Sequence, residues 1–511
     1  MSMDPFAFLS SAVRAPGRAA LTVAASAACL GLLWAIVQRA RTHHKLRHIP
    51  GPAHTFFLGA LRHMSSDPNW FSSRHRYNRA LHAKYGSVVK LMLPVGKGAA
   101  IHVNSPRVAQ SLILGHAELF PTRPGGVSGI PLGLLSIRSV SMWRAHRQAI
   151  ITGLSTAAMR EYQPQIQARA SQLCEHLTRR GCAGAVAVDV YGPLTAATLD
   201  VIGDIGFGVD LKAMEDMEGS VFAKAGADIM VGTVQGVPVP PAVHQMLACL
   251  PVRWQPTFRR RLLSGVAVFS GVASQVYHAQ ESSLNPAPAA SGHSLLRALA
   301  AAKLSFAETR DEIITLLIAG HETTANTMCW ALKLLAENPQ AQARARAEAE
   351  AALKAAGDGP LGLDTAVGLS YLKAVFYEAL RLYPTVPTIG RLSAKDVEIE
   401  GVHVPAGTIV VYSIAAASLD EGIWGPDALE FRPDRHLAAA APDAAWLPFG
   451  GGARKCIGFK LAELEATTFL AVLLHRFDVG RPPKGTPPPE ELTDLTLGPK
   501  TGLLLSLVPR V

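Results

Sequence analysis

The sequence predicts a mainly α-helical protein with a minor β part, built as one large domain behind an N-terminal membrane anchor. Three observations support this. The chain of 511 residues is 49% hydrophobic and 17% charged, which excludes an intrinsically disordered protein. Apolar residues recur at helical spacing through most of residues 140–380. No long Gly/Ser-rich linker divides the chain. We expect an anchor with its basic flank at 1–48 and the folded domain at 49–511.

The N-terminal segment is the candidate anchor. Residues 19–37 are uncharged, and about 20 apolar residues span a bilayer. Four basic residues follow, which favours a cytosolic location for the rest of the chain: Arg39, Arg41, Lys45 and Arg47. A transit peptide and a cleaved signal peptide are alternatives to a signal anchor. The sequence HIPGP at 48–52 predicts a stiff elbow between anchor and domain.

Charge and cysteine usage exclude several classes of protein. The net charge is +10, and residues 1–50 hold six basic residues and one acidic residue. Half of the excess positive charge therefore lies before the folded domain. A nucleic-acid-binding protein would carry a basic patch on the domain itself, so we expect no nucleic-acid partner. Six scattered cysteines with no C-x-x-C pair argue against a disulfide scaffold or a zinc ribbon. No N-x-S/T sequon occurs, which fits a reducing, non-lumenal compartment.

The elements of the domain follow from residue patterns. Two short strands are expected within 84–104 and further short β runs within 386–412. Apolar periodicity predicts helices at 296–303 and 309–337, the second ended by Asn338-Pro339. An Ala-, Glu- and Arg-rich helix with a solvated face is expected at 340–356, a helix at 458–475, and a proline-rich loop after it.

The most specific feature is the sequence FGGGARKCIG at 449–458. Its glycines allow the backbone to wrap closely around a flat group and to present amide donors. Cys456 stands at the start of a predicted helix, where the helix dipole, Arg454 and Lys455 stabilise a thiolate. A thiolate in such a loop is a good axial ligand for haem iron. The alternatives are a buried structural cysteine and a nucleotide-binding glycine loop, for which the required spacing is missing.

This decapeptide resembles the haem-binding loop of the cytochrome P450 monooxygenases, eukaryotic microsomal type. Every fixed position of F-x-x-G-x-R-x-C-x-G is present: Phe449, Gly452, Arg454, Cys456 and Gly458. The resemblance extends over nearly the whole of 49–511. It implies a cytochrome P450 fold, with haem b held non-covalently and Cys456 as the axial ligand of the iron.

Glu378 and Arg381 form an E-x-x-R pair on one helix face, a spacing that alone is most often a surface pair. The resemblance adds Arg435, from the sequence FRPDR at 431–435, as the third member of a buried network. Asp434 and His436 depart slightly from the residues usual in the family at those positions.

Trp143 and Arg147 fit W-x-x-x-R, a spacing that directs both side chains to one side of a helix. The resemblance implies that both contact a haem propionate, with Arg391 and Arg454 as further propionate ligands. The alternative is a core tryptophan on an ordinary amphipathic helix.

The sequence AGHETT at 319–324 lies within the helix predicted at 309–337. A zinc protease would need histidine where Ala325 stands, so that interpretation fails. Polar residues within an apolar helix are costly without a purpose. The resemblance implies that Glu322 and Thr323 deliver protons to bound oxygen. Ala319 stands where one branch of the family has a glutamate that esterifies the haem, so we expect no covalent haem.

Two apolar loops at 121–139 and 229–251 resemble the family's substrate-cap loop and its membrane-dipping access loop, and ordinary surface loops are the alternative. Their composition fits a lipophilic small molecule that enters from the bilayer. The candidate pocket residues are Ile130, Leu132, Leu316, Ala319, Val386 and Ile389.

The resemblance implies a monooxygenase that inserts one atom of O2 into a lipophilic substrate, most often as a hydroxyl group. No flavin or ferredoxin segment follows the haem loop, so NADPH electrons are expected from a separate flavoprotein reductase, docked on Arg144, Lys455 and Lys460. The expected location is the endoplasmic reticulum membrane, single-pass with a cytosolic domain, or alternatively a mitochondrial or plastid membrane. A haem-thiolate isomerase or dehydratase that needs no external O2 is another possibility, against which the Glu322-Thr323 pair argues. A non-catalytic haem-binding protein is the third.

Overall fold

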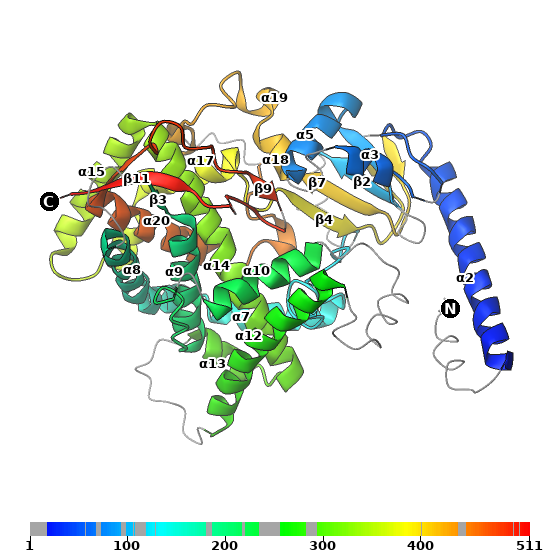
Figure 1. The fold of residues 1–511 in the computed structure, drawn as a ribbon, viewed down its shortest axis with the longest axis horizontal. Coiled ribbons are helices and arrows are strands. Elements are labelled where there is room, and N and C mark those ends of the chain that lie inside the picture. Colours follow the sequence, from blue (N-terminus) through cyan, green and yellow to red (C-terminus); the bar gives the residue numbers. More distant parts are fainter. Residues whose placement is uncertain are drawn as a thin grey trace.

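The protein is described by a computed structural model that covers residues 18–56, 58–67, 73–93, 99–105, 107, 119–127, 129–179, 187–216, 220–234, 256–282, 294–399, 401–437, 446–493, 495–499 and 501–510. Helices dominate it, as predicted, and gather on one side of the molecule (Figure 1). The helices are α2 (Arg18–Lys45), α3 (Leu61–Ser66), α5 (Arg74–Tyr85), α7 (Val140–Thr152), α8 (Thr156–Arg179), α9 (Tyr191–Val201), α10 (Val221–Val234), α12 (Thr257–Ser282), α13 (Ser294–Ala301), α14 (Phe306–Glu337), α15 (Pro339–Ala356), α16 (Leu363–Val367), α17 (Ser370–Leu382), α18 (Ile414–Ser418), α19 (Glu421–Trp424) and α20 (Phe459–Arg476).

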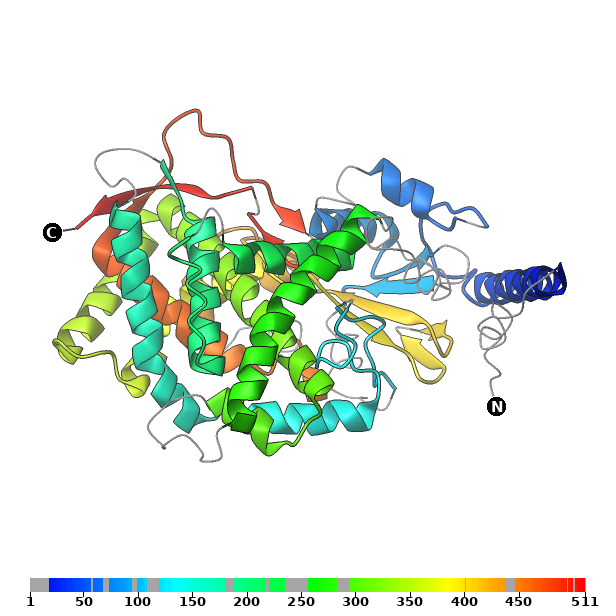
Figure 2. The same ribbon diagram turned by 60° about the horizontal axis from the view of Figure 1, so that its bottom comes forward.

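The minor β part contains one larger sheet on the opposite side from most helices (Figure 2). Its strand order is β1-β2-β7-β4, with β2 and β7 parallel and the other pairs antiparallel. A second sheet has the order β3-β11-β8, and β5-β6 and β9-β10 form small pairs. The strands are β1 (Val88–Met92), β2 (Ala99–Val103), β3 (Ala187–Asp189), β4 (Thr388–Leu392), β5 (Val397–Ile399), β6 (Val402–Val404), β7 (Ile409–Ser413), β8 (Phe477–Gly480), β9 (Leu492–Thr493), β10 (Leu497–Gly498) and β11 (Leu504–Pro509).

Helix α14 is the central element, packed against α9, α12, α17 and α20. It begins with a capping box, in which Ser305 accepts from the Glu308 amide and Glu308 accepts from the Ser305 amide. Asn338 ends it and Pro339 starts α15, as the sequence predicts. Side chains on all sides of α14 are buried, which is typical of a helix in the middle of a core. This central position lets residues halfway along α14 reach an internal site.

The sequence-predicted elements are recovered with small shifts at their ends. The predicted strands at 84–104 are β1 and β2, the β runs at 386–412 are β4 to β7, and the helices at 296–303 and 458–475 are α13 and α20. The expected loop at 229–251 is instead helical up to Val234 in α10, because its apolar residues continue the buried face of that helix. The rest of that loop, 235–251, lies outside the described residues.

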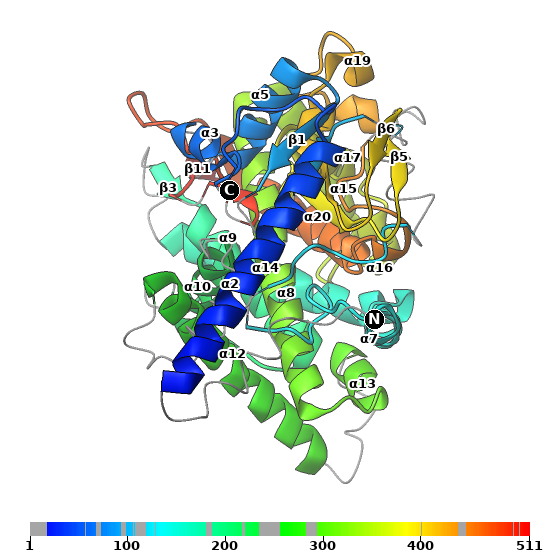
Figure 3. The same cartoon turned by 90° about the vertical axis from the view of Figure 1, so that its right-hand side faces the viewer.

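Helix α2 contains the segment predicted to cross a membrane. It projects from the body as one continuous helix (Figures 1 and 3). Within the described residues, no helix combines the length and the apolar character that crossing a membrane requires, so the predicted transmembrane span at 19–37 is not supported. Alanines and polar residues dilute the apolar side chains of this helix.

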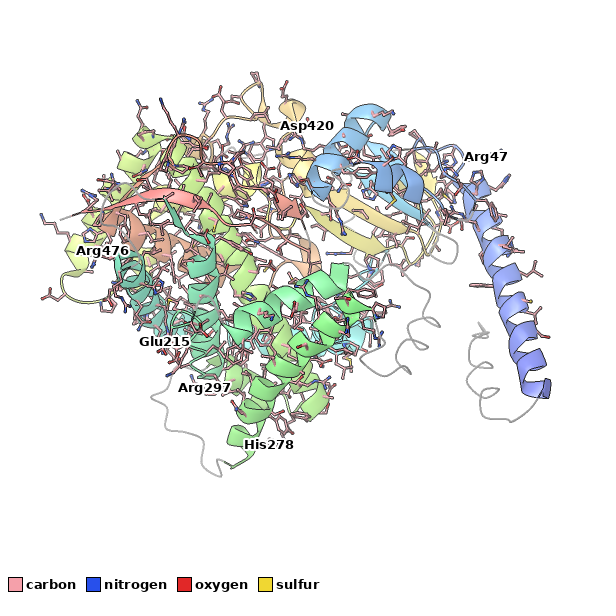
Figure 4. All side chains as sticks on the ribbon, in the orientation of Figure 1. Arg47, Glu215, His278, Arg297, Asp420 and Arg476 are labelled. Atoms are coloured by element: carbon pink, nitrogen blue, oxygen red, sulfur yellow. The ribbon has the colours of Figure 1, made fainter. Side chains whose placement is uncertain are left out.

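The C-terminal end of α2 is joined to the β sheet. Arg39, one of the four basic residues after the predicted span, is buried and donates to the carbonyl oxygens of Phe56 and Leu93. Lys90 of β1 donates from Nζ to the Leu46 carbonyl over 2.8 Å. Arg47, labelled in Figure 4, lies where the helix meets the body.

Candidate active site

The loop before α20 holds Cys456 in a defined geometry. Gly450 and Gly452 have φ values of 65° and 60°, a left-handed conformation that side chains other than glycine rarely adopt. The Cys456 amide donates to the Phe449 carbonyl over 2.8 Å, which closes the loop. Helix α20 begins three residues later at Phe459, so the thiol lies beside a helix N-terminus as predicted.

The Cys456 side chain has accessible surface, although protein atoms surround it on all sides. Burial raises the pKa of its thiol, while a hydrogen bond from the Gly458 amide and the charges of Arg123, Arg147 and Lys455 act to lower it. We interpret an exposed but desolvated thiol as one that faces a space inside the protein rather than the outer surface.

Four arginines converge beside this loop. Arg454 lies over the Trp143 ring at 4.1 Å and donates from Nε to the Pro121 carbonyl over 2.9 Å, and Arg147 lies 5.6 Å from the same ring. Burial and the nearby charges of Arg123 and other guanidinium groups lower the pKa of Arg391 to about 9 and that of Arg454 to about 10. The pKa values of Arg123 and Arg147 are lowered too, mainly by burial. Positive charges held this close indicate a site for anionic groups.

Glu378 is the centre of a buried network that holds the segment before the Cys456 loop. Its carboxylate accepts both Nε and Nη2 of Arg381 at 2.8 Å, Nε of Arg435 at 3.0 Å and the Arg432 amide at 2.9 Å. Arg381 also donates to the carbonyls of Ser418, Ala428 and Glu430. The helix α17 and the 3₁₀ turn at Pro433–His436 are therefore fixed to each other.

The middle of α14 has one partly exposed face. Between residues 311 and 332, every residue is buried except Ala319, Gly320 and Thr323. Thr323 donates from Oγ1 to the Ala319 carbonyl over 2.9 Å, and Glu322 is buried beside it. Ala319, Gly320 and Thr323 all belong to the AGHETT sequence, so the least buried positions in this part of α14 coincide with the segment for which the resemblance implies oxygen chemistry.

The sequence pattern that defines the cytochrome P450 family matches residues 49–506. The chain belongs to the cytochrome P450 family. It is 28% identical over 476 residues to a protein named putative cytochrome P450 135A1 from Mycobacterium tuberculosis, covering 90% of this chain and 95% of that protein. It is 26% identical over 496 residues to cytochrome P450 3A11 of Mus musculus, covering 94% and 95%. It is also 27% identical over 508 residues to cytochrome P450 monooxygenase 91 of Postia placenta, covering 88% and 91%.

Membership of the family implies haem with a cysteine thiolate ligand, and the geometry fits that group. Nη1 and Nη2 of Arg454 are buried and have no hydrogen-bond partner among the described residues. Propionates would supply acceptors for these two nitrogens and would lie beside the positive charges of Arg147, Arg391 and Arg123. Cys456 would hold the iron. The predicted haem contacts of this cytochrome P450 thus lie on elements that the fold brings together.

Two residues of the site were missed by sequence analysis. Arg123 follows Thr122, which forms an isolated β-bridge with Leu392, so the loop before α7 is held beside Arg391. A lone arginine between prolines in an apolar loop was the only available signal. His436 was read as a departure from the family pattern. Its Nε2 nevertheless bonds to Oε2 of Glu378 at 2.8 Å, so it joins the network.

The candidate substrate residues of the P450 domain fall into two groups. Ala319, Ile389 and Leu132 are partly exposed and Val386 is exposed, which is expected of residues that line a substrate pocket. Leu316 is nearly buried and Ile130 has no exposed surface. Their role in substrate binding stays a prediction.

Acid is expected to weaken this P450 domain through Glu378. Hydrogen bonds from Arg381 and His436, the charge of Arg381 and the Arg432 amide outweigh burial and lower the pKa of Glu378 from 4.5 to about 2. Its stabilisation is therefore complete above pH 4.5 and lost as the pH falls toward 2, which corresponds to about 3 kcal/mol. Urea unfolding between pH 5 and pH 3 should show about 2 kcal/mol of this loss, and Glu378→Gln should remove that part of the pH dependence. A variant with the same acid sensitivity as the parent would contradict the assignment.

Proposed function

We propose that this cytochrome P450 hydroxylates a lipophilic small molecule, using electrons from NADPH delivered by a separate flavoprotein reductase. The observation that carries the proposal is the acid and alcohol pair Glu322-Thr323, in which Thr323 lies on the partly exposed face of the buried part of α14 and Glu322 is buried next to it. An isomerase or dehydratase acting on a peroxide needs no proton delivery to O2. The retained pair therefore supports O2-dependent chemistry.

The bound haem would supply the reductive activation of O2. The chain would supply the proton donor at Thr323. Thr323 holds its hydroxyl proton on Oγ1, now donated to the Ala319 carbonyl, and a small rotation redirects it toward the open face. Behind it, Thr327 donates to the Thr323 carbonyl and shares a 2.8 Å hydrogen bond with the Thr385 hydroxyl. Thr327 therefore bonds to the carbonyl of Thr323 and not to its hydroxyl, which holds the backbone at Thr323 in place, while the buried surroundings exclude bulk water.

The reductase is proposed to dock near the Cys456 loop. Arg144 on α7 and Lys460 on α20 are exposed, and Lys455 is partly exposed with its Nζ 3.9 Å from the Phe459 ring centre. These charges would attract an acidic partner and speed its association at low salt. Location at the endoplasmic reticulum membrane stays a prediction.

Replacing Thr323 with valine, or Glu322 with glutamine, is expected to uncouple electron use from product formation. With NADPH and a flavoprotein reductase, product formed per NADPH consumed should fall at least about tenfold, because proton delivery by a side chain contributes about 10²-fold or more. NADPH consumption and hydrogen peroxide release are measured alongside product from a panel of lipophilic substrates.

Thr324→Val is the matched control for this experiment. Thr324 is buried on the same helix and donates to the Gly320 carbonyl, but it does not lie on the partly exposed face. The Thr324→Val variant should form as much product per NADPH consumed as the parent protein. Rearrangement or dehydration of a peroxide substrate itself, without NADPH or reductase and with no oxygen atom transferred to a second molecule, would overturn the proposal in favour of an isomerase or dehydratase.

A further inference from the structure

A second group of charged residues lies two turns before the AGHETT residues on α14. Asp311 and Glu312 both have side chains with no exposed surface. Each accepts a backbone amide from the segment 130–137: Leu132 donates to Asp311 Oδ2 at 2.9 Å, and Leu134 donates to Glu312 Oε2 at 3.1 Å. We call residues 130–137 the wall segment.

The other oxygen of each carboxylate is also occupied. Glu312 Oε1 lies 2.7 Å from Nδ1 of His146 on α7, one turn after Trp143. Asp311 Oδ1 accepts Nε and Nη2 of Arg310. Burial opposes the charge on His146, but its contacts with Glu312 and Glu308 outweigh this effect and raise its pKa. Each carboxylate therefore contacts one positively charged side chain and accepts one backbone amide of the wall segment.

The backbone of the wall segment rests directly on α14. A Cβ atom added to Gly133 would lie 1.9 Å from Thr315 Oγ1 and 2.8 Å from the Asp311 carbonyl oxygen. Because neither distance is compatible with a side chain, glycine is needed for this close approach. Apolar packing alone would hold an apolar loop, so two fully buried carboxylates are an expensive addition unless they fix the position of this backbone.

We propose that Asp311 and Glu312 are positioning residues that hold the wall segment rigid, and that this fixed wall sets which part of a substrate reaches the oxidation site. This inference rests on the proposed function. Leu132 is half-buried in the wall segment, and its own amide is one of the two that are clamped. Substrates would then enter by another route, and their shape would have to fit against a rigid wall segment.

Amide hydrogen exchange of the whole protein tests the rigidity directly. Glu312→Leu and Asp311→Leu remove the acceptors, and we expect the amides of residues 132–137 to exchange at least about tenfold faster. Glu312→Gln and Asp311→Asn keep an acceptor oxygen, so the exchange rates of these amides should remain closer to those of the parent protein. Gly133→Ala pushes the same backbone from α14 without changing any charge and should also speed exchange.

Binding of two azoles tests the consequence for ligand choice. Absorbance titrations with imidazole and 4-phenylimidazole give the ratio of their dissociation constants. We expect Glu312→Leu and Gly133→Ala to change that ratio at least about fivefold, since only the larger ligand reaches a displaced wall. Imidazole affinity alone should change little.

Glu337→Gln is the control, because Glu337 lies at the far end of α14 and pairs with Lys333. It should alter neither readout. Unchanged exchange at 132–137 in both Glu312→Leu and Gly133→Ala would overturn the proposal, as would faster exchange with an unchanged azole ratio. Failure of the parent protein to bind haem would contradict the proposed function instead, and the exchange result would still stand.

Discussion

Replacing Cys456 with alanine is expected to abolish thiolate-ligated haem in this protein. The reduced parent protein should give a strongly red-shifted Soret band with carbon monoxide, and the variant should lack it completely. The reason is that the thiolate supplies the electron density behind this spectrum, and no other cysteine among the described residues has an exposed side chain in the folded domain. The measurement is a carbon monoxide difference spectrum of dithionite-reduced protein.

Cys329→Ala and Cys174→Ala are the matched controls. Both thiols are buried in the core, and burial raises the pKa of each, so neither is a thiolate near neutral pH. Both variants should keep the red-shifted band. Retention of that band in Cys456→Ala, with circular dichroism equal to that of the parent, would exclude Cys456 as the ligand.

Replacing Glu378 with glutamine is expected to destabilise the domain by about 3–5 kcal/mol, since it leaves the fully buried Arg381 guanidinium without its counter-charge. Arg435 and His436 lose the same acceptor. Because this network fixes the segment leading into the Cys456 loop, haem content should fall together with stability. Urea unfolding followed by tryptophan fluorescence, with the haem-to-protein ratio, measures both effects.

Asp434→Asn is the control for this variant. Asp434 lies in the same 3₁₀ turn but pairs with Arg344 at the exposed surface, where an ion pair contributes less than about 1 kcal/mol. A change of under about 1 kcal/mol for Glu378→Gln would show that the network is not needed for stability.

Local patterns predicted the parts of the site whose residues are close in sequence. The Cys456 loop, the Glu378-Arg381 pair and the Trp143-Arg147 pair each lie within one turn or loop, so local spacing indicated their elements, while their roles came from the resemblance and stay predictions. The central helix was predicted within three residues because its apolar periodicity and the proline after it are local signals.

Residues joined only by tertiary contacts were not predictable in the same way. Arg123 reaches the site because a bridge joins Thr122 to Leu392, residues that are far apart in the chain. Asp311 and Glu312 lie near the start of α14, and nothing in the residues around them indicated the amides of Leu132 and Leu134 that their carboxylates accept. Arg39 fitted a basic flank beside a membrane, and nothing in its neighbours indicated the carbonyl oxygens that bury it.

The attachment of α2 decides where this chain can be shortened for expression. Leu46 and Ile49 belong to the hydrophobic cluster under the β sheet, and Arg39 is bonded to carbonyls on two separate loops. A truncated protein that starts at residue 49 would expose that cluster and leave the Lys90 ammonium without the Leu46 carbonyl. The shortest stable fragment should therefore begin before Arg39, so that the last turns of α2 still cover the hydrophobic cluster.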